Sequence, residues 1–308
     1  NPNAPVGRIL GHEGVGRIVS VGSEVKDFKP GDIVAVPAVT PMWRNLDVQD
    51  CNHQHSGGYL GGRYLSSKWD GMFAEYFKVP DVDLNVAKIP DGVSLEAAAL
   101  VGDMVTTGFH GVELADVKFG DRVCVIGIGP VGLMSVAGCV LRGAAEIYAV
   151  GHRPVTRELA MQYGATATID YQDGPIVEQV MKLTGGQQIE KVIIAGGEPT
   201  VFNDALALVK YTGTVANLAG HGRTELLLPI YTNESGFGFC AHKTVTGGLC
   251  PGGRRRIERL MGMVKTGRFE PEKLITHRFY GLDGIEEAFD LMKSKNPEVI
   301  KPIIYFDK

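Results

Sequence analysis

Residues 123–132 constrain this chain more than any other stretch, because an apolar, β-branched run leads directly into a G-x-G-x-x-G turn. The glycines of the turn are Gly127, Gly129 and Gly132. The residues that follow, 133–141, are mostly apolar and predict a helix that is buried along much of its length. The motif alone would fit an ordinary glycine-rich turn, but a strand, this turn and a buried helix in sequence are typical of a dinucleotide site.

Each glycine of this turn has its own role in such a site. The first permits the tight turn, the second lets the backbone approach a pyrophosphate, and the third lets helix and strand pack closely. The N-terminus of the helix then faces the phosphates, because its unpaired N–H groups and its dipole favour negative charge. The candidate cofactor-binding residues of the turn are Gly127, Ile128, Gly129, Pro130, Val131 and Gly132.

Helix and strand patterns alternate after the turn, which predicts an α/β fold with a doubly wound parallel sheet. The predicted strands lie at 146–150, 167–170, 191–195, 214–218 and 243–249, and the predicted helices at 157–163, 176–183, 202–209, 254–265 and 285–293. Before the turn, short glycine-punctuated β patterns predict a small barrel-like unit, and strand alternation resumes at 71–79. Residues 302–306 predict a final strand.

The composition is that of an ordinary globular protein. A length of 308 residues is typical of two domains, and a formal net charge of −4 gives no reason to expect binding to nucleic acid or to a membrane. The basic triplet Arg254–Arg256 opens an amphipathic helix and is most simply a solvated face. No bilayer-spanning run or signal-peptide pattern is visible. Cys124 and Cys139 fit buried free thiols, which favours a reducing, cytoplasmic setting.

Several polar features could hold a metal ion, and the residues alone leave them open. His12 and Glu13 stand side by side between glycines, but a lone histidine near a strand end is more often structural. Asp103 lies among apolar and small residues, so it is either a ligand, a helix cap or a hydrogen-bond partner of the backbone. The tract 51–55, Cys-Asn-His-Gln-His, lacks the spacing of a four-ligand zinc site and favours a plain loop.

Further motifs are spread along the whole chain. They are Gly11-His12-Glu13-(x2)-Gly16-(x5)-Gly22-(x2)-Val25, Gly31-Asp32, Gly71-x-x-Ala74-Glu75-Tyr76, the Gly127–Gly132 turn, Ala241-His242-Lys243-Thr244 and residues 247–254. This combination resembles the zinc-containing medium-chain alcohol dehydrogenases, and within them the NADP-dependent secondary-alcohol (isopropanol) dehydrogenases of anaerobic bacteria and protists. The resemblance covers nearly all of the chain.

The resemblance implies a Rossmann domain, which is the doubly wound sheet, and a GroES-like β-rich catalytic domain. The implied boundaries are 1–106 for the catalytic domain, 107–248 for the Rossmann NADP-binding domain and 249–308 for a return to the catalytic domain. The family's cysteine ligand and proton-relay residues precede the motifs found here, so the resemblance implies a catalytic domain that lacks its N-terminal part. It also implies a homotetramer.

In that family a catalytic zinc is held by a Cys, a His and an Asp, and a Glu beside the His joins or leaves the coordination shell. The matching positions are His12, Asp103 and Glu13, for which the resemblance implies metal-binding and catalytic roles. Zinc accepts imidazole and carboxylate ligands and leaves a position for substrate oxygen. The implied reaction is hydride transfer between NADP(H) and small secondary alcohols or ketones, with one catalytic zinc as Lewis acid and no structural zinc.

The second strand of the nucleotide fold ends without the carboxylate with which an NAD enzyme holds the ribose hydroxyls. It is followed by Gly151, His152 and Arg153, which match the family's phosphate-binding Gly-Ser-Arg-Pro motif with His in place of Ser. Arg153 offers a forked cation for a 2′-phosphate, although it would also fit a surface arginine at a helix start. Tyr171 matches the family's residue near the 2′-phosphate, and Thr107 is the candidate for contacting the nicotinamide.

Other enzyme classes fit less well. Zinc-free reductases of the same superfamily lack the His-Glu and Asp positions, and polyol dehydrogenases generally have Glu where this chain has Asp103. The rival from another functional class is a non-catalytic or truncated NADPH-binding protein without a complete zinc site. Zinc content separates this rival from the enzyme.

Overall fold

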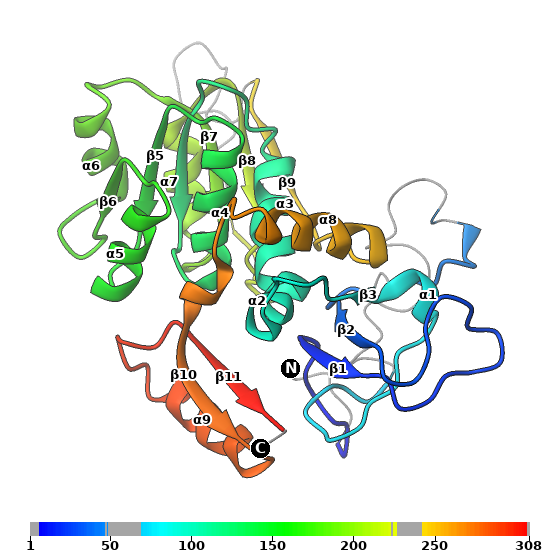
Figure 1. Cartoon of the computed structure of the whole chain (residues 1–308). Helices are drawn as coiled ribbons and strands as arrows, with labels where there is room; N and C mark the ends of the chain where they lie inside the picture. The colour runs from blue at the N-terminus through cyan, green and yellow to red at the C-terminus, as the bar shows by residue number, and fades with distance from the viewer. Residues whose placement is uncertain (1–5, 47, 49–68, 223, 227–241, 307–308) are drawn as a thin grey trace. The chain divides into compact units, whose positions relative to one another are not determined.

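The computed structural model describes residues 6–46, 48, 69–222, 224–226 and 242–306, so the Cys51–His55 tract lies outside the described residues. The chain divides into two compact units. Unit 1 is Asn1–Thr106 together with Leu249–Lys308, and unit 2 is Thr107–Gly248. The six-stranded sheet belongs to unit 2 and the two smaller sheets to unit 1 (Figure 1), and each unit has its own core.

Unit 2 is built on a six-stranded parallel sheet in the order β6-β5-β4-β7-β8-β9, with helices on both faces (Figure 1). The strands are β4 (Arg122–Ile126), β5 (Glu146–Val150), β6 (Ala167–Ile169), β7 (Ile189–Ile194), β8 (Val209–Asn217) and β9 (Thr244–Gly247). The helices are α3 (Thr106–Leu114), α4 (Pro130–Leu141), α5 (Pro154–Gln162), α6 (Ile176–Leu183) and α7 (Val201–Leu208). The chain starts at the central strand β4, moves to one edge and returns on the other side, which confirms the doubly wound α/β fold.

The strands of unit 2 are apolar along their whole length because both faces of the sheet are covered. In β4, Val123, Cys124 and Val125 are all fully buried. The cysteine side chain belongs to the core that α6 and α7 cover. Cys124 and Cys139 are buried free cysteines, as the sequence predicts, and burial raises the pKa of both thiols. They are therefore neutral packing residues.

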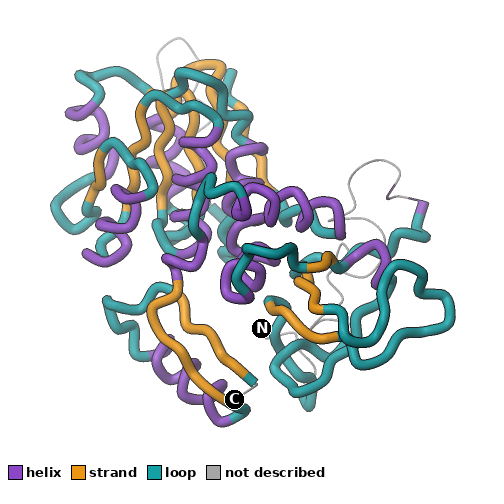
Figure 2. The backbone as a smooth tube through the Cα atoms, in the orientation of Figure 1, coloured by secondary structure: helices purple, strands orange, loops and turns teal. Residues whose placement is uncertain are grey.

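Unit 1 consists largely of loops around short elements (Figure 2). Its strands are the antiparallel β1 (Gly14–Arg17), β2 (Ile33–Val36) and β3 (Ala87–Lys88) and the parallel pair β10 (Ile275–Tyr280) and β11 (Lys301–Tyr305). Its helices are α1 (Val82–Asn85), α2 (Leu95–Leu100), a π-helical segment (Val101–Val105), α8 (Arg254–Lys265), a 3-10 turn (Pro271–Leu274) and α9 (Asp283–Lys293). Among all described helices, none combines the length and the apolar character needed to cross a membrane.

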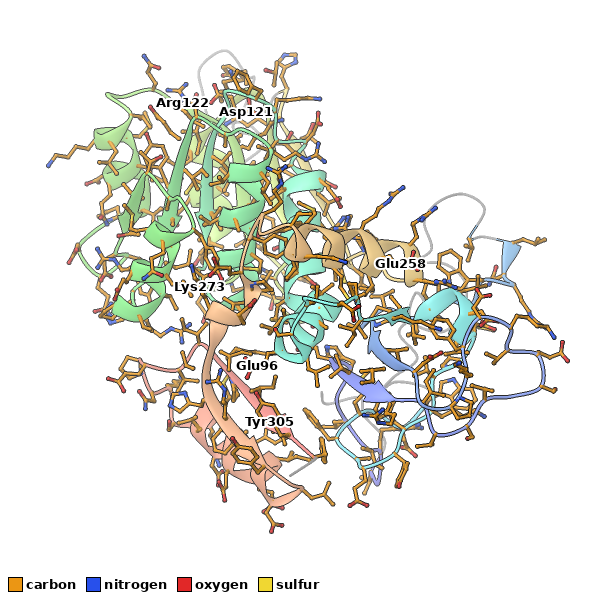
Figure 3. All side chains as sticks on the ribbon, in the orientation of Figure 1. Glu96, Asp121, Arg122, Glu258, Lys273 and Tyr305 are labelled. Atoms are coloured by element: carbon orange, nitrogen blue, oxygen red, sulfur yellow. The ribbon has the colours of Figure 1, made fainter. Side chains whose placement is uncertain are left out.

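The C-terminal strands of unit 1 are fastened to α2 by a charged cluster. Glu96 of α2 accepts hydrogen bonds from Arg278 of β10, at 3.0 Å from Nε and 3.2 Å from Nη2. The hydroxyl of Tyr305 in β11 donates to the same carboxylate, and Figure 3 labels both Glu96 and Tyr305. A bidentate arginine–carboxylate pair fixes orientation as well as distance, so the last strand returns to a defined place in unit 1.

The strand expected at 71–79 is not formed. The N–H groups of Gly71 and Phe73 instead donate to the carbonyls of Ile9 and Leu10, and the two segments run side by side as loops. Met72 is buried in the core around Phe28, Val34, Val36 and Val86. The alternation of apolar residues thus reflects the burial of a loop, and residues 71–79 do not form a regular ladder of strand hydrogen bonds.

The expected solvated face at Arg254–Arg256 is also wrong for two of the three arginines. Arg254 donates to Asp27 and Glu258, and Arg256 donates to the side-chain and backbone oxygens of Thr106. Only the side chain of Arg255 is mostly exposed, at 80%. The first and third arginines therefore anchor the start of α8 to the rest of unit 1, which a charge count along the sequence cannot reveal.

Candidate active site

Three sequence-predicted residues, His12, Glu13 and Asp103, come together in unit 1. One potential ligand atom from each of them lies within 4.8 Å of the others. Nε2 of His12 is 3.2 Å from Oδ2 of Asp103, although the two residues are 91 positions apart in the chain. All three side chains are partly buried, so the cluster is accessible to a small ligand.

The π-helical segment brings Asp103 to this place. Gly102 packs so closely on the end of β2 that an added Cβ would lie 2.6 Å from the carbonyl oxygen of Val36. The carbonyl of Gly102 also accepts a hydrogen bond of 2.9 Å from Ala38. One π-helical turn within an α-helical run is a feature often found at functional sites, because it redirects a side chain.

A second glycine holds the loop that carries His12. Gly11 has a φ of 95°, a left-handed conformation that other residues avoid, and an added Cβ would lie 2.9 Å from the ring of Phe73. Its carbonyl accepts a 3.0 Å hydrogen bond from Met72. The loop before β1 is therefore held by the neighbouring 71–73 segment, and His12 points at Asp103 from a fixed backbone.

The donor set fits zinc. An imidazole nitrogen and carboxylate oxygens are ordinary zinc ligands, and two ligand atoms of a tetrahedral site lie about 3.3–3.5 Å apart. The His12–Asp103 separation of 3.2 Å is close to this value. Oε1 of Glu13 lies 2.7 Å from Nζ of Lys301, the first residue of β11, so this carboxylate is paired with a cation at the edge of the cluster.

The glycine turn has the geometry that the motif predicts. Gly127 has a φ of 91°, and an added Cβ would lie 2.6 Å from the backbone of Gly196, which follows β7. A Cβ on Gly132 would lie 2.0 Å from the carbonyl oxygen of Gly127, whereas a Cβ on Gly129 would meet nothing within 4 Å. The first and third glycines are thus required by packing, and the second leaves open space above the turn.

This open space fits a dinucleotide. Gly129 is the N-cap of α4 and Pro130 is in its first turn, so the free N–H groups at the start of a twelve-residue helix face the space that Gly129 leaves. The loops after β4 and β7 meet here, at the point where the strand order reverses, which is where ligands bind in doubly wound sheets. Ile128 lies against Gly151, where an added Cβ would be 2.3 Å from its Cγ1.

The other predicted cofactor residues also belong to unit 2. Arg153 is the N-cap of α5, is partly buried and has its pKa lowered by burial. The ring of Tyr171 lies 5.8 Å from that of His152. Thr107 precedes Gly108, which packs against α4 so tightly that a Cβ would lie 2.6 Å from the carbonyl oxygen of Val131. Thr107 therefore stands on a helix that touches the glycine turn.

Comparison with known proteins gives a consistent answer. Residues 130–265 match the family model for the zinc-binding dehydrogenases, and residues 1–91 match that for the alcohol dehydrogenase GroES-like domain. The NADP-dependent isopropanol dehydrogenase of Thermoanaerobacter brockii is 55% identical over 96% of this chain and 84% of that protein. The protein of the same name from Clostridium beijerinckii is 52% identical over the same shares. The chain belongs to the zinc-binding alcohol dehydrogenase family.

Solved structures agree with this membership. The zinc-dependent alcohol dehydrogenase 2 from Streptococcus pneumonia has a TM-score of 0.86 and 28% identity, and the match covers 100% of this chain and 86% of that one. The family and the combination of a Rossmann sheet with a GroES-like part, both predicted from motifs, are confirmed. The roles of individual residues stay predictions.

Sequence reasoning missed two side chains of this zinc-binding alcohol dehydrogenase. Lys301 lies 288 positions from its partner Glu13, and no local pattern in the sequence connects them. Asp170, at the end of β6, lies 3.1 Å from Nδ1 of His152. The sequence indicates that the second strand ends without a carboxylate, but the residue after the next strand of the sheet places one beside the same turn. Because consecutive parallel strands end at the same sheet edge, this neighbour could have been anticipated.

Proposed function

We propose that this alcohol dehydrogenase interconverts small secondary alcohols and ketones with NADP(H), and that His12, Glu13 and Asp103 hold its catalytic zinc. The cluster of these three side chains carries the proposal, because it assembles an imidazole and two carboxylates from distant parts of unit 1. The names of the similar isopropanol dehydrogenases support both the substrate class and the cofactor.

When bound, zinc supplies Lewis-acid polarisation of the substrate oxygen, and NADP(H) supplies or accepts the hydride. His12 contributes an imidazole lone pair through Nε2, and Asp103 contributes Oδ2, the atom that faces it. Lys301 holds Glu13 through Oε1 and so lowers the negative charge that the ligand set presents. The chain thereby combines ligands for a divalent metal ion with one ammonium group, that of Lys301, which partly offsets their negative charge.

The cofactor is held by unit 2 in this proposal. The glycine turn and the N-terminus of α4 bind the pyrophosphate through backbone N–H groups. Arg153, His152 and Tyr171 bind the 2′-phosphate, and Thr107 contacts the nicotinamide end. Thr107 lies in α3, the first helix of unit 2.

Three finer points belong to the same proposal. We infer one catalytic zinc and no structural zinc, as the family resemblance implies, with His12, Glu13 and Asp103 as the candidate ligands. The homotetramer is what the family resemblance implies, and the cytoplasmic location is proposed because the buried free thiols fit a reducing compartment. Light scattering on the purified protein tests the tetramer.

Zinc analysis of the dialysed protein tests the zinc site and the rival function together. We expect about one zinc per chain, together with oxidation of propan-2-ol that is faster with NADP⁺ than with NAD⁺. His12→Ala should lose both the zinc and the activity. His277→Ala is the matched control, because His277 also lies in unit 1 but hydrogen bonds Thr276 outside the cluster. A wild-type protein without zinc or activity that still binds NADPH would establish the non-catalytic alternative.

A further inference from the structure

A buried carboxylate lies beside the residues that we propose to bind the 2′-phosphate, where an unpaired negative charge would repel that group. Asp170 is only 8% exposed and accepts hydrogen bonds from three sides. Gln172 N–H donates at 2.9 Å, Nη1 of Arg157 at 3.2 Å, and Nδ1 of His152 faces both oxygens at 3.1 and 3.2 Å. The backbone hydrogen bond from Gln172 and the contact with His152 lower the pKa of Asp170, so it is a carboxylate at neutral pH.

This carboxylate sets the proton and the direction of the His152 ring. A carboxylate is an acceptor only, so the ring nitrogen that faces it, Nδ1, carries a proton. The second nitrogen, Nε2, makes no hydrogen bond among the residues that the structure describes, and 41% of the side chain is exposed. The ring of Tyr171 lies 5.8 Å away, so two of the side chains assigned to the 2′-phosphate are already neighbours.

We propose that Asp170 is a positioning residue that orients His152, so that the imidazolium Nε2–H binds the 2′-phosphate of NADP(H) beside Arg153. This inference rests on the proposed 2′-phosphate site and extends it to a residue that makes no contact with the phosphate itself. The Nδ1 side of the ring faces Asp170, which leaves Nε2 on the opposite side of the ring for the phosphate. The arrangement is the anion-binding counterpart of a carboxylate that orients a metal-bound histidine.

Charge balance explains why Asp170 does not repel the phosphate. Arg157 donates to Asp170 at 3.2 Å and to Thr168 Oγ1 at 3.2 Å, so one fixed cation already offsets the carboxylate. With His152 protonated, the three side chains carry one net positive charge, and Arg153 adds another. Removing the Asp170 charge therefore has two opposite effects on NADPH: it releases His152 from its orientation, and it removes a negative charge near the phosphate.

Because the two effects are opposite, the sign of the change in NADPH affinity on replacing Asp170 tests the inference. Dissociation constants of NADPH and NADH are measured by titration calorimetry for the wild type, His152→Ala, Asp170→Asn and the double variant. We expect His152→Ala to weaken NADPH about tenfold, as for the loss of a charge-assisted hydrogen bond, and to leave NADH within about twofold. Asp170→Asn should weaken NADPH about fivefold in the wild-type background but strengthen it in the His152→Ala background.

The other outcomes refute the inference in distinguishable ways. Stronger NADPH binding by Asp170→Asn in both backgrounds would mean that the carboxylate only repels, and equal losses for NADPH and NADH would mean a purely structural clamp. Glu178→Gln is the matched control, because it removes one negative charge from an exposed residue of α6 in the same unit. Arg153→Ala separates the two levels of the proposal. If it weakens both cofactors equally, the 2′-phosphate site itself is misplaced; if it weakens NADPH alone while His152→Ala has no effect, only the present inference fails.

Discussion

Replacing Glu190 by glutamine should destabilise unit 2 strongly at neutral pH and hardly at all in acid. Glu190, in β7, bridges the two neighbouring strands: Arg122 of β4 donates to it at 3.0 Å from its backbone N and 3.2 Å from Nε, and Lys210 of β8 donates at 2.8 Å. The Glu190 side chain is only 17% exposed. Figure 3 labels Arg122 at the edge of the sheet where these strands begin.

The magnitude follows from the pKa of this carboxyl group. Burial raises the pKa of Glu190, but the hydrogen bonds from Arg122 and Lys210 outweigh burial and lower it from 4.5 to about 2. A fall of about 2.5 in pKa corresponds to about 3 kcal/mol of unfolding free energy. Because the folded-state pKa is lowered, this stabilisation is present above pH 4.5 and is lost as the pH falls through about 2.

The assay must report on unit 2 alone, because a protein of two units need not unfold in one step. Trp43 and Trp69 belong to unit 1, so tryptophan fluorescence is unsuitable. Hydrogen exchange of peptides from β4, β7 and β8, followed against urea, gives the local unfolding free energy. We expect Glu190→Gln to lose about 3 kcal/mol at pH 7 and to approach the wild type near pH 2.

Two controls sharpen this prediction. Glu178→Gln should leave the local stability within about 0.5 kcal/mol, because its side chain is exposed. The affinity for NADPH should not change in Glu190→Gln, since the cluster lies at the amino ends of the strands and dinucleotides bind at their carboxyl ends. A loss below about 0.5 kcal/mol at pH 7, or a loss that grows in acid, would refute the reasoning.

Two further pairs of variants test the candidate site. Lys301→Met should tighten zinc binding about tenfold in competition with a chelator, because it removes a cation 2.7 Å from Glu13. Lys273→Met is the control and should have no effect, because Lys273 pairs with Glu270. Unchanged or weaker zinc binding in Lys301→Met would contradict this prediction. Gly132→Ala should lower the unfolding free energy of unit 2 by about 3 kcal/mol, because its Cβ would clash with the backbone. Gly129→Ala should keep the melting temperature but weaken the binding of NADPH. The reverse pattern would contradict the roles assigned to the two glycines.

The sheet of unit 2 could be read from the sequence almost element by element. Strand 146–150 and helix 176–183 have the predicted bounds, and the glycine turn has the predicted geometry. Parallel strands covered on both faces are continuous apolar runs separated by glycine turns, so local pattern and tertiary environment agree there. Unit 1 offers no such agreement. The segment 71–79 alternates like a strand, yet it lies as a loop along residues 9–11.

The candidate metal site could not be read from local patterns. Taken alone, His12 favours a structural histidine, and Asp103 fits a cap as well as a ligand. Their contact joins residues 91 positions apart through the π-helical segment and the close approach of Gly102 to β2. Only the family resemblance pointed to this pairing, and it gave no hint of Lys301. Which charged residues from distant segments come together depends on the topology of the fold, and a short window of sequence does not show it.

The two candidate sites use the same residue types and differ in the balance of their charges. At the metal cluster two carboxylates, Glu13 and Asp103, face one ammonium group and a histidine, so the side chains leave one negative charge for a divalent cation. At the proposed 2′-phosphate site the ratio is reversed, because the single carboxylate of Asp170 contacts the Arg157 guanidinium and His152, and Arg153 is assigned to the same site. In each site one group carries the same sign of charge as the proposed ligand: Lys301 at the metal cluster and Asp170 at the 2′-phosphate site. Each is paired with an oppositely charged side chain, which limits its repulsion of the ligand and fixes its direction. A histidine next to a carboxylate is therefore not by itself diagnostic of a metal site. We expect a net negative charge on the neighbouring side chains to favour a cation as ligand, and a net positive charge to favour an anion.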